Sequence, residues 1–196
     1  KTRVMSELNE PGIEVSSESL QVLKKILEQY LPITSLLILD GSTPPGVPTD
    51  YYRTIAEKAN KYSVKTVIDA RGELLREGIK AHPYLIKPNL EEMEETFGEK
   101  ITTKKDAIRI ARKAINEGVN IVCVSLGKDG ALLVTENEAY YSPGINIQVQ
   151  GVQGAGDSMV AGMSYAMTRK MPLSEILRYG VAVAHGSLVL EGTQMC

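Results

Sequence analysis

Short apolar runs that alternate with helical patterns constrain the fold of this chain more than any other feature. The apolar runs are residues 36–39, 66–69, 84–87 and 121–125. Runs of this length are typical of strands that are buried on both faces of a parallel sheet. Helical periodicity or helix-capping pairs stand before and between them, at residues 17–30, 51–62, 74–75, 90–97 and 103–117. The alternation predicts an α/β fold in which a mostly parallel sheet carries helices on both faces.

The pattern changes in the last third of the chain. Turn signals separate two short strands, residues 131–135 and 139–142, which predict an antiparallel edge on the sheet. Residues 145–149 place apolar side chains at every second position, which predicts one more half-buried strand. The chain ends in two helical patterns, the second over residues 173–188. Because no repeat or linker interrupts this order, we expect a single domain over residues 1–196.

A glycine-rich junction, Gly154-Ala155-Gly156-Asp157, joins the predicted strand to the first of these helices. The two glycines let backbone N–H groups crowd into a concave nest at the positive end of the helix. Such a nest favours an anion, and the first side chain beyond it is the carboxylate of Asp157. A phosphate site with an adjacent base indicates phosphoryl transfer. The alternative is a tight turn, in which Asp157 is only an ordinary first-turn carboxylate.

Polar residues end each predicted parallel strand, at positions 40–42, 69–72, 87–89 and 125–127. In open α/β sheets, ligands bind at the carboxyl ends of the strands. Together with the glycine junction, these ends make five pieces of one rim. Each piece alone also fits an ordinary turn, but their agreement favours a phosphate-handling site.

Asn89 and Glu92 stand three residues apart at the start of a predicted helix. Both side chains therefore lie near the same end of one helical face, where they could hold hydrated Mg²⁺ through water. The same spacing also fits a capping box, in which the two side chains satisfy backbone N–H groups. The spacing leaves both interpretations open.

The composition excludes several classes of partner. The chain has 196 residues, 43% of them hydrophobic, and a formal net charge of −2. This charge argues against a nucleic-acid or anionic-membrane surface, and no apolar run approaches the roughly 20 residues of a membrane span. Cys123 and Cys196 offer no disulfide framework and no metal-ligand spacing. We expect a cytoplasmic protein.

Four segments resemble the signatures of one family. Residues 154–158 match a Gly-Ala-Gly-Asp signature, and residues 87–92 match a Lys-Pro-Asn-x-x-Glu segment. Residues 125–130 are similar to a Thr-Leu-Gly-x-x-Gly segment, and residues 41–46 to a Gly-Ser-Leu-Pro-x-Gly loop. The four occur in family order and cover nearly the whole chain. They resemble the ribokinase-like, or PfkB, carbohydrate kinases.

The resemblance implies a ribokinase-like three-layer sandwich and ATP-dependent phosphorylation of a sugar-phosphate hydroxyl, with Mg²⁺. Asp157 would be the catalytic base, and the backbone of Gly154, Ala155 and Gly156 would form the anion hole. The nucleotide side would be formed by Lys87, Asn89, Glu92, Ser125, Gly127 and Gly130. Asn89 and Glu92 would also organise Mg²⁺, and Arg3 and Ser42 would contact the phosphate already on the sugar.

Within the family, the chain most resembles the 1-phosphofructokinases, which convert fructose 1-phosphate and ATP into fructose 1,6-bisphosphate and ADP. Tagatose-6-phosphate kinases come next. The sugar-holding and lid-forming N-terminal part of the family is missing, so we expect the C-terminal part of a longer chain. A homodimer is a further expectation, since the lid is often an interface. The alternative is a nucleotide-binding module without turnover.

Two departures from the family pattern bear on the site. Gly151-Val152-Gln153 replace a segment that usually carries a hydroxyl beside the anion hole. Asp40 stands where serine is usual, which adds a negative charge close to the expected acceptor phosphate. We expect this charge to weaken anion binding unless a cation compensates for it.

Overall fold

The protein is built on one six-stranded sheet whose spatial strand order, β1-β2-β3-β4-β5-β6, follows the order along the chain. The computed structural model describes residue 10 and residues 12–190. β1 to β4 pair in parallel, and β5 and β6 add the antiparallel edge that the turn signals predict. The strands are β1 (Leu36–Asp40), β2 (Lys65–Asp69), β3 (Leu85–Ile86), β4 (Ile121–Ser125), β5 (Ala131–Val134) and β6 (Ala139–Ser142).

Most helices begin and end close to their predicted bounds, but α3 is an eight-residue helix where only a short turn near residues 74–75 was expected. Capping side chains fix several of these boundaries: Ser16 accepts from the Ser19 N–H at the start of α1, and Thr103 with Asp106 forms a capping box on α5. The helices are α1 (Ser17–Tyr30), α2 (Tyr51–Asn60), α3 (Gly72–Ile79), α4 (Leu90–Phe97), α5 (Lys104–Asn116), α6 (Ala155–Thr168) and α7 (Leu173–Leu188). Two short 3₁₀ helices, η1 (Leu31–Ile33) and η2 (Gly127–Asp129), complete the elements.

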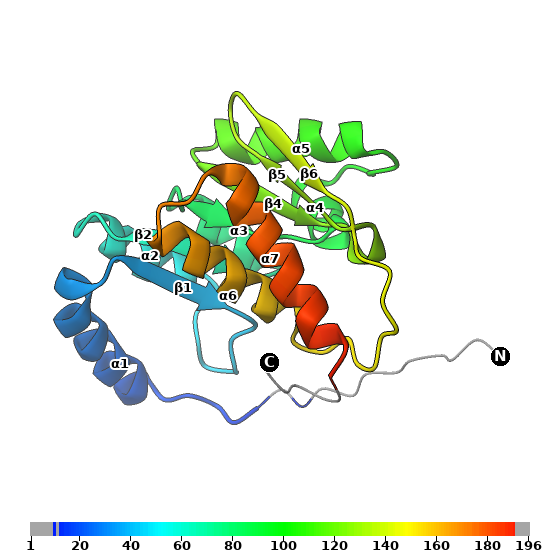
Figure 1. The fold of residues 1–196 in the computed structure, drawn as a ribbon. Helices are drawn as coiled ribbons and strands as arrows, with labels where there is room; N and C mark the ends of the chain where they lie inside the picture. Colours follow the sequence, from blue (N-terminus) through cyan, green and yellow to red (C-terminus); the bar gives the residue numbers. More distant parts are fainter. Residues whose placement is uncertain (1–9, 11, 191–196) are drawn as a thin grey trace.

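The strand order explains which helices cover which face. When parallel strands advance in one direction through right-handed connections, the connecting helices all lie on one face of the sheet. Accordingly, α2 to α5 pack on one face, and α6 and α7 lie side by side on the other (Figure 1). The first core contains Ile68, Ile86 and Val122; the second contains Cys123 and Met163. The predicted three-layer sandwich is confirmed.

Parallel pairing brings the carboxyl ends of β1 to β4 to one edge of the sheet. The ladder sets Asp40 opposite Asp69, and the Gly41 N–H donates to the Asp69 carbonyl at 2.9 Å. Asn89 and Ser125, at the ends of the next two strands, form a parallel bridge. The predicted rim therefore exists as one continuous edge.

Residues 145–149 do not form the predicted strand. The chain leaves the sheet after Ser142 through Pro143 and Gly144, and the segment that follows has no strand assignment among the described residues. Ile145 and Val149 are 53% and 49% exposed. The alternating apolar side chains therefore do not pack into the core. They line a cavity that is described below.

The apolar stripe of α1 is also more exposed than its periodicity indicates. No residue of this helix is buried, and Leu23 and Ile26 are 41% and 44% exposed.

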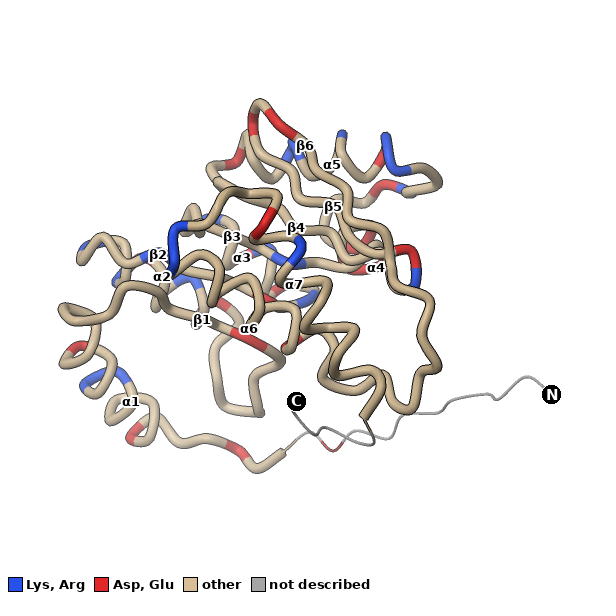
Figure 2. The backbone as a smooth tube through the Cα atoms, viewed as in Figure 1, with Lys and Arg blue, Asp and Glu red and all other residues tan. Residues whose placement is uncertain are grey.

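Along the backbone, segments of both charge signs are interspersed, for example on α1 and around α5 (Figure 2). Within the described residues, none of the helices combines the length and the apolar character that a membrane crossing requires.

Candidate active site

The N-terminus of α6 is open. Gly154 is its N-cap, with a φ of 75°, and in the described part of the chain no side chain caps the helix. Its first backbone hydrogen bond runs from the Ser158 N–H to the Gly154 carbonyl at 2.8 Å. The preceding N–H groups, at the positive end of the helix dipole, are therefore left for an external acceptor. This is the geometry of an anion site.

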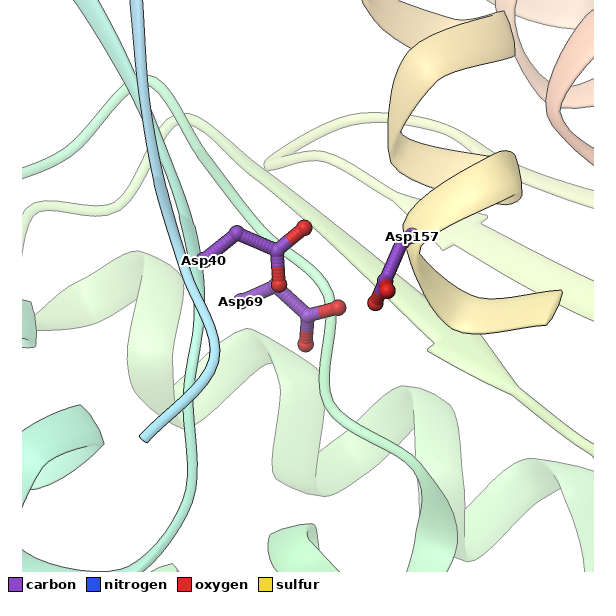
Figure 3. A group of neighbouring side chains, drawn as sticks. All are labelled: Asp40, Asp69 and Asp157. Carbon is purple, nitrogen blue, oxygen red and sulfur yellow. The ribbon is translucent and has the colours of Figure 1, made fainter. Parts of the chain in front are cut away.

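Three carboxylates converge beside this helix end. Asp40 and Asp69 end adjacent strands, and Asp157 projects from the first turn of α6 toward them (Figure 3). One carboxylate oxygen of each residue lies within 4.8 Å of those of the other two. The sequence predicts Asp40 and Asp69 on the rim but indicates no role for Asp69. The strand register sets Asp69 opposite Asp40, and the packing of α6 on the sheet brings the carboxylate of Asp157 close to both.

Lys87 supplies a positive charge to this cluster. Its side chain is 6% exposed, and its Nζ lies 2.8 Å from Oδ2 of Asp69. Burial raises the pKa of Asp69, and the nearby ammonium opposes that rise. Burial lowers the pKa of Lys87, but the charge of Asp69, the hydrogen bond to it and the nearby Cys123 and Glu92 together outweigh this effect, so the net shift of the pKa is upward. Lys87 is thus a buried cation held in place by Asp69.

The same cation lies against the glycine junction. A Cβ placed on Gly156 would be 3.3 Å from Nζ of Lys87 and 3.8 Å from Oδ2 of Asp69. A side chain at this position would therefore press on the ion pair. Gly156 lets the start of α6 approach Lys87 closely, so the open N–H groups and a buried ammonium lie at one place.

Asp40 has the most perturbed carboxyl group of the cluster. Partial burial, followed by repulsion from Asp69 and Asp157, raises its pKa to about 6. Lys87 opposes the rise without cancelling it. The charge of Asp40 was expected to weaken anion binding unless a cation compensates for it; Lys87 is such a cation, but it is paired mainly with Asp69.

Asn89 and Glu92 form the capping box of α4. The Glu92 N–H donates to Asn89 Oδ1 at 2.8 Å, and the Asn89 N–H donates to Glu92 Oε2 at 2.8 Å. The capping interpretation is confirmed. Burial raises the pKa of Glu92, against the effect of the Asn89 N–H and of Lys87. A role of these two residues toward Mg²⁺ stays a prediction.

A cavity of about 770 Å³ adjoins the open helix end. This volume lies within the range typical of small-molecule sites. Its wall is formed by strand ends and glycine turns, by the segment after β6, and by the N-terminus of α6 with the last turns of α7. The residues include Asn89, Ser125, Gly127, Gly130, Ile145, Ile147, Val149, Val152, Ala155, Gly156 and His185.

The cavity explains the apolar alternation at 145–149. Ile145, Ile147 and Val149 all line it, together with the intervening Asn146, so the apolar side chains of this segment form part of the cavity wall and not of a sheet face. Val152, in the segment that departs from the family pattern, adds a further apolar wall. Gly156 belongs to the cavity and also contacts the lysine–carboxylate cluster. The start of α6 therefore links a largely apolar cavity to a charged rim.

The structure brings together most of the predicted site residues. Ser125, Gly127, Gly130 and Asn89 line the cavity, and Lys87 and Glu92 lie next to it at the ends of β3 and at α4. Ser42 is exposed in the loop after β1, outside the cavity wall. Arg3 and Cys196 lie outside the described residues.

Comparisons with known proteins agree with this geometry. The chain is 35% identical over 183 residues to the 1-phosphofructokinase of Bacillus subtilis, an alignment that covers 92% of this chain and 59% of that protein. It is 30% identical to the ATP-dependent 6-phosphofructokinase isozyme 2 of Escherichia coli, over 95% of this chain and 60% of that one. The chain thus spans about 60% of the length of these curated relatives.

Solved structures show the same relation. The phosphofructokinase-2 of Escherichia coli in complex with potassium superposes with a TM-score of 0.87 at 30% identity, over 96% of this chain and 61% of that one. Residues 9–196 match the pfkB family of carbohydrate kinases. A match over nearly the whole chain, together with the open glycine-rich helix end beside Asp157, shows that the chain belongs to the PfkB family of carbohydrate kinases.

Proposed function

We propose that this chain carries the nucleotide site and the catalytic base of an ATP-dependent sugar-phosphate kinase. The observation that carries the proposal is the open N-terminus of α6, which lies between a cavity of about 770 Å³ and the carboxylate of Asp157. A phosphoryl donor and an acceptor hydroxyl must meet at one anion-binding point, and this helix end offers that point.

The residues divide into roles by position. The apolar part of the cavity accepts the base of ATP, and the N–H groups of Gly154, Ala155 and Gly156 hold the phosphoryl group in transfer. Asp157 accepts the proton of the acceptor hydroxyl while the hydroxyl oxygen forms a bond to the γ-phosphorus. The bond from that phosphorus to the bridging oxygen breaks, and ADP leaves with the electron pair. Lys87 stabilises the negative charge from the buried side.

The oxygen-rich surroundings of the glycine junction fit Mg²⁺, which prefers carboxylate, amide and water oxygens. Asn89 and Glu92 would hold the ion through water, and the Asp157 cluster adds carboxylates nearby. When bound, the ion neutralises charge that develops on the phosphates. Asn89 would act through its side chain while it also caps α4.

The acceptor that we favour is fructose 1-phosphate, because the Bacillus subtilis relative at 35% identity is a 1-phosphofructokinase. Tagatose 6-phosphate is the second candidate. Exposed Ser42 stands on the acceptor side of the rim, where it could contact the phosphate of the sugar, and we propose the same for Arg3. The function of a nucleotide-binding module without turnover is the remaining alternative.

One assay separates these possibilities. The chain, alone and joined to the N-terminal portion of a relative, is incubated with ATP, Mg²⁺ and one of three acceptors: fructose 1-phosphate, tagatose 6-phosphate or fructose 6-phosphate. We expect ADP release to be fastest with fructose 1-phosphate. ATP binding without ADP release from any acceptor would favour the module, and release with tagatose 6-phosphate alone would identify the other kinase.

Two further predictions concern the setting of the protein. We propose that it acts in the cytoplasm, where sugar phosphates and ATP are available, and that two copies associate. A relative named phosphofructokinase-2 has a tetrameric inhibited form, which supports self-association within the family. Sedimentation with and without ATP measures the association of this chain directly.

A further inference from the structure

His185 connects the last turn of α7 to the wall of the cavity. The residue is 9% exposed and lines the cavity. Its Nε2 lies 2.9 Å from the N–H of Ile145, and its Nδ1 lies 2.7 Å from the carbonyl oxygen of Val181. A carbonyl oxygen can only accept and a backbone N–H can only donate, so Nδ1 carries the proton and Nε2 is the acceptor. The neutral ring satisfies both partners.

His185 binds the segment after β6, residues 143–150, which does not form a strand of the sheet. Residues 143–150 are tied to α7 at two points, by the Ile145 bond and by the Gln150 N–H, which donates to the Leu188 carbonyl at 2.8 Å. Between these points, Ile147 and Val149 face the cavity. Because β-ladder bonds do not fix this stretch, its distance from α7 depends on the two ties.

We propose that His185 is a positioning residue for the nucleotide site, which holds residues 145–149 as the wall against the nucleoside part of ATP. This inference rests on the proposed function, because it takes the cavity as the nucleotide site. The phosphates belong at the glycine end of the cavity, so the wall that His185 holds, at the α7 end, contacts the base or ribose. The imidazole acts through Ile145 and not on the reacting atoms.

Three variants test the proposal in the full chain. His185→Leu removes the acceptor and keeps an apolar side chain of similar size. His185→Gln restores an acceptor that can reach the Ile145 N–H. Ser187→Ala is the matched control, because the Ser187 hydroxyl donates to the Ala184 carbonyl at 2.8 Å in the same helical turn but does not line the cavity.

The expected result is a selective loss of nucleotide affinity. His185→Leu should raise the KM for ATP about five- to tenfold, which corresponds to one lost hydrogen bond, and leave kcat and the acceptor KM within about twofold. His185→Gln should restore most of the affinity, and Ser187→Ala should not change it. Amide exchange of Ile145, measured by NMR without nucleotide, should be fast in His185→Leu and slow in His185→Gln.

Calorimetry with ATP on the unchanged protein separates the possible failures. If the unchanged protein does not bind ATP, the proposed function is wrong, and the positioning role falls with it. If it binds ATP and His185→Leu binds equally well, only the role of His185 is overturned. A loss that is the same in His185→Leu and Ser187→Ala would also overturn it. If His185→Leu does not fold, His185→Asn replaces it, since the shorter amide does not reach Ile145.

Discussion

Helices α4 and α6 both begin at the carboxyl edge of the sheet, but their N-termini are built in opposite ways. α4 is closed by its own side chains, since Asn89 and Glu92 satisfy two backbone N–H groups at 2.8 Å each. α6 begins at a glycine with a φ of 75° and has no side-chain cap in the described part of the chain. A closed end stabilises the fold by itself, whereas an open end keeps its N–H groups for a ligand.

A helix N-terminus at this edge of the sheet can therefore serve either stability, as in α4, or ligand binding, as in α6. Glycine at the N-cap costs only about a few tenths of a kcal/mol relative to a capping side chain, so α6 can leave its N–H groups open at little cost in stability. Lys87 adds a buried ammonium to the open end, whereas the start of α5 has a capping box like that of α4. Four substitutions test this contrast, in order of their expected effect on catalysis and ATP binding.

Asp157→Asn should have the largest effect. The amide cannot accept the hydroxyl proton, so kcat should fall by about 10²–10⁴-fold while ATP binding is kept. Steady-state kinetics gives the first quantity and calorimetry the second. Turnover close to that of the unchanged protein would remove Asp157 from the role of base.

Gly154→Ala should follow in size, with Gly98→Ala as its matched control. Gly154 begins α6 and Gly98 ends α4; both have a positive φ, 75° and 68°, and a Cβ on either would meet nothing within 4 Å. Each substitution should therefore lower the free energy of unfolding by a similar amount, about 1–2 kcal/mol. Only Gly154→Ala should weaken ATP binding, about tenfold or more, because only its strain acts on the open N–H groups.

Chemical denaturation and calorimetry measure the two quantities for this pair. Equal losses of ATP affinity in Gly154→Ala and Gly98→Ala would show that the open end of α6 is an ordinary helix start.

Asn89→Ala should have a smaller effect on activity. It decides whether Asn89 only caps α4 or also helps to hold Mg²⁺. Thr103→Ala removes the equivalent cap of α5, where the Thr103 hydroxyl accepts from the Asp106 N–H at 3.2 Å. Both should cost about 1 kcal/mol of stability in denaturation. We expect only Asn89→Ala to raise the Mg²⁺ concentration that half-maximal activity requires. If the two variants share one Mg²⁺ dependence, Asn89 is a cap alone.

Asp40→Asn should change catalysis least, and its signature is a dependence of stability on pH. The folded-state pKa of Asp40 is about 6, raised by burial and by Asp69 and Asp157 from an ordinary value of 3.8. The folded protein therefore holds this proton more tightly than the unfolded chain. The Asp40 contribution is most favourable below about pH 4 and declines as the pH rises to about 6.

Relative to the unchanged protein, Asp40→Asn should therefore become more stable as the pH rises through that window and keep a constant advantage above it. Denaturation at a series of pH values measures this difference. A difference that is the same at all pH values would contradict the raised pKa.

The fold was predictable because local signals and long-range rules agreed. The capping pairs at Asn89 and Thr103 and the apolar runs of β1 and β4 mark their elements directly. The one wrong element, the strand expected at 145–149, shows the limit of periodicity. Apolar residues at every second position indicate that one side of an extended segment faces an apolar surface. That surface can be the wall of a cavity as well as the core under a sheet.

The site was predictable only in part. The glycine junction and the strand ends were expected to share a rim, and they do. The contact between Asp69 and Lys87 depends on the register of β2 and β3, which sequence patterns do not specify. His185 and Ile145 are 40 residues apart, so no local spacing joins them. Pairs of this kind need the tertiary structure.

Amide exchange at the helix N-termini tests the central contrast most directly. NMR exchange rates are measured for residues 155–157 of α6 and for the capped N–H groups of Asn89 and Glu92 at α4, with and without ATP and Mg²⁺. ATP should slow exchange at the open start of α6 strongly and change the Asn89 and Glu92 N–H groups little, because the capping box already satisfies these two groups. Unchanged rates at residues 155–157 in the ATP-bound protein would contradict the assignment of this helix end as the phosphate site.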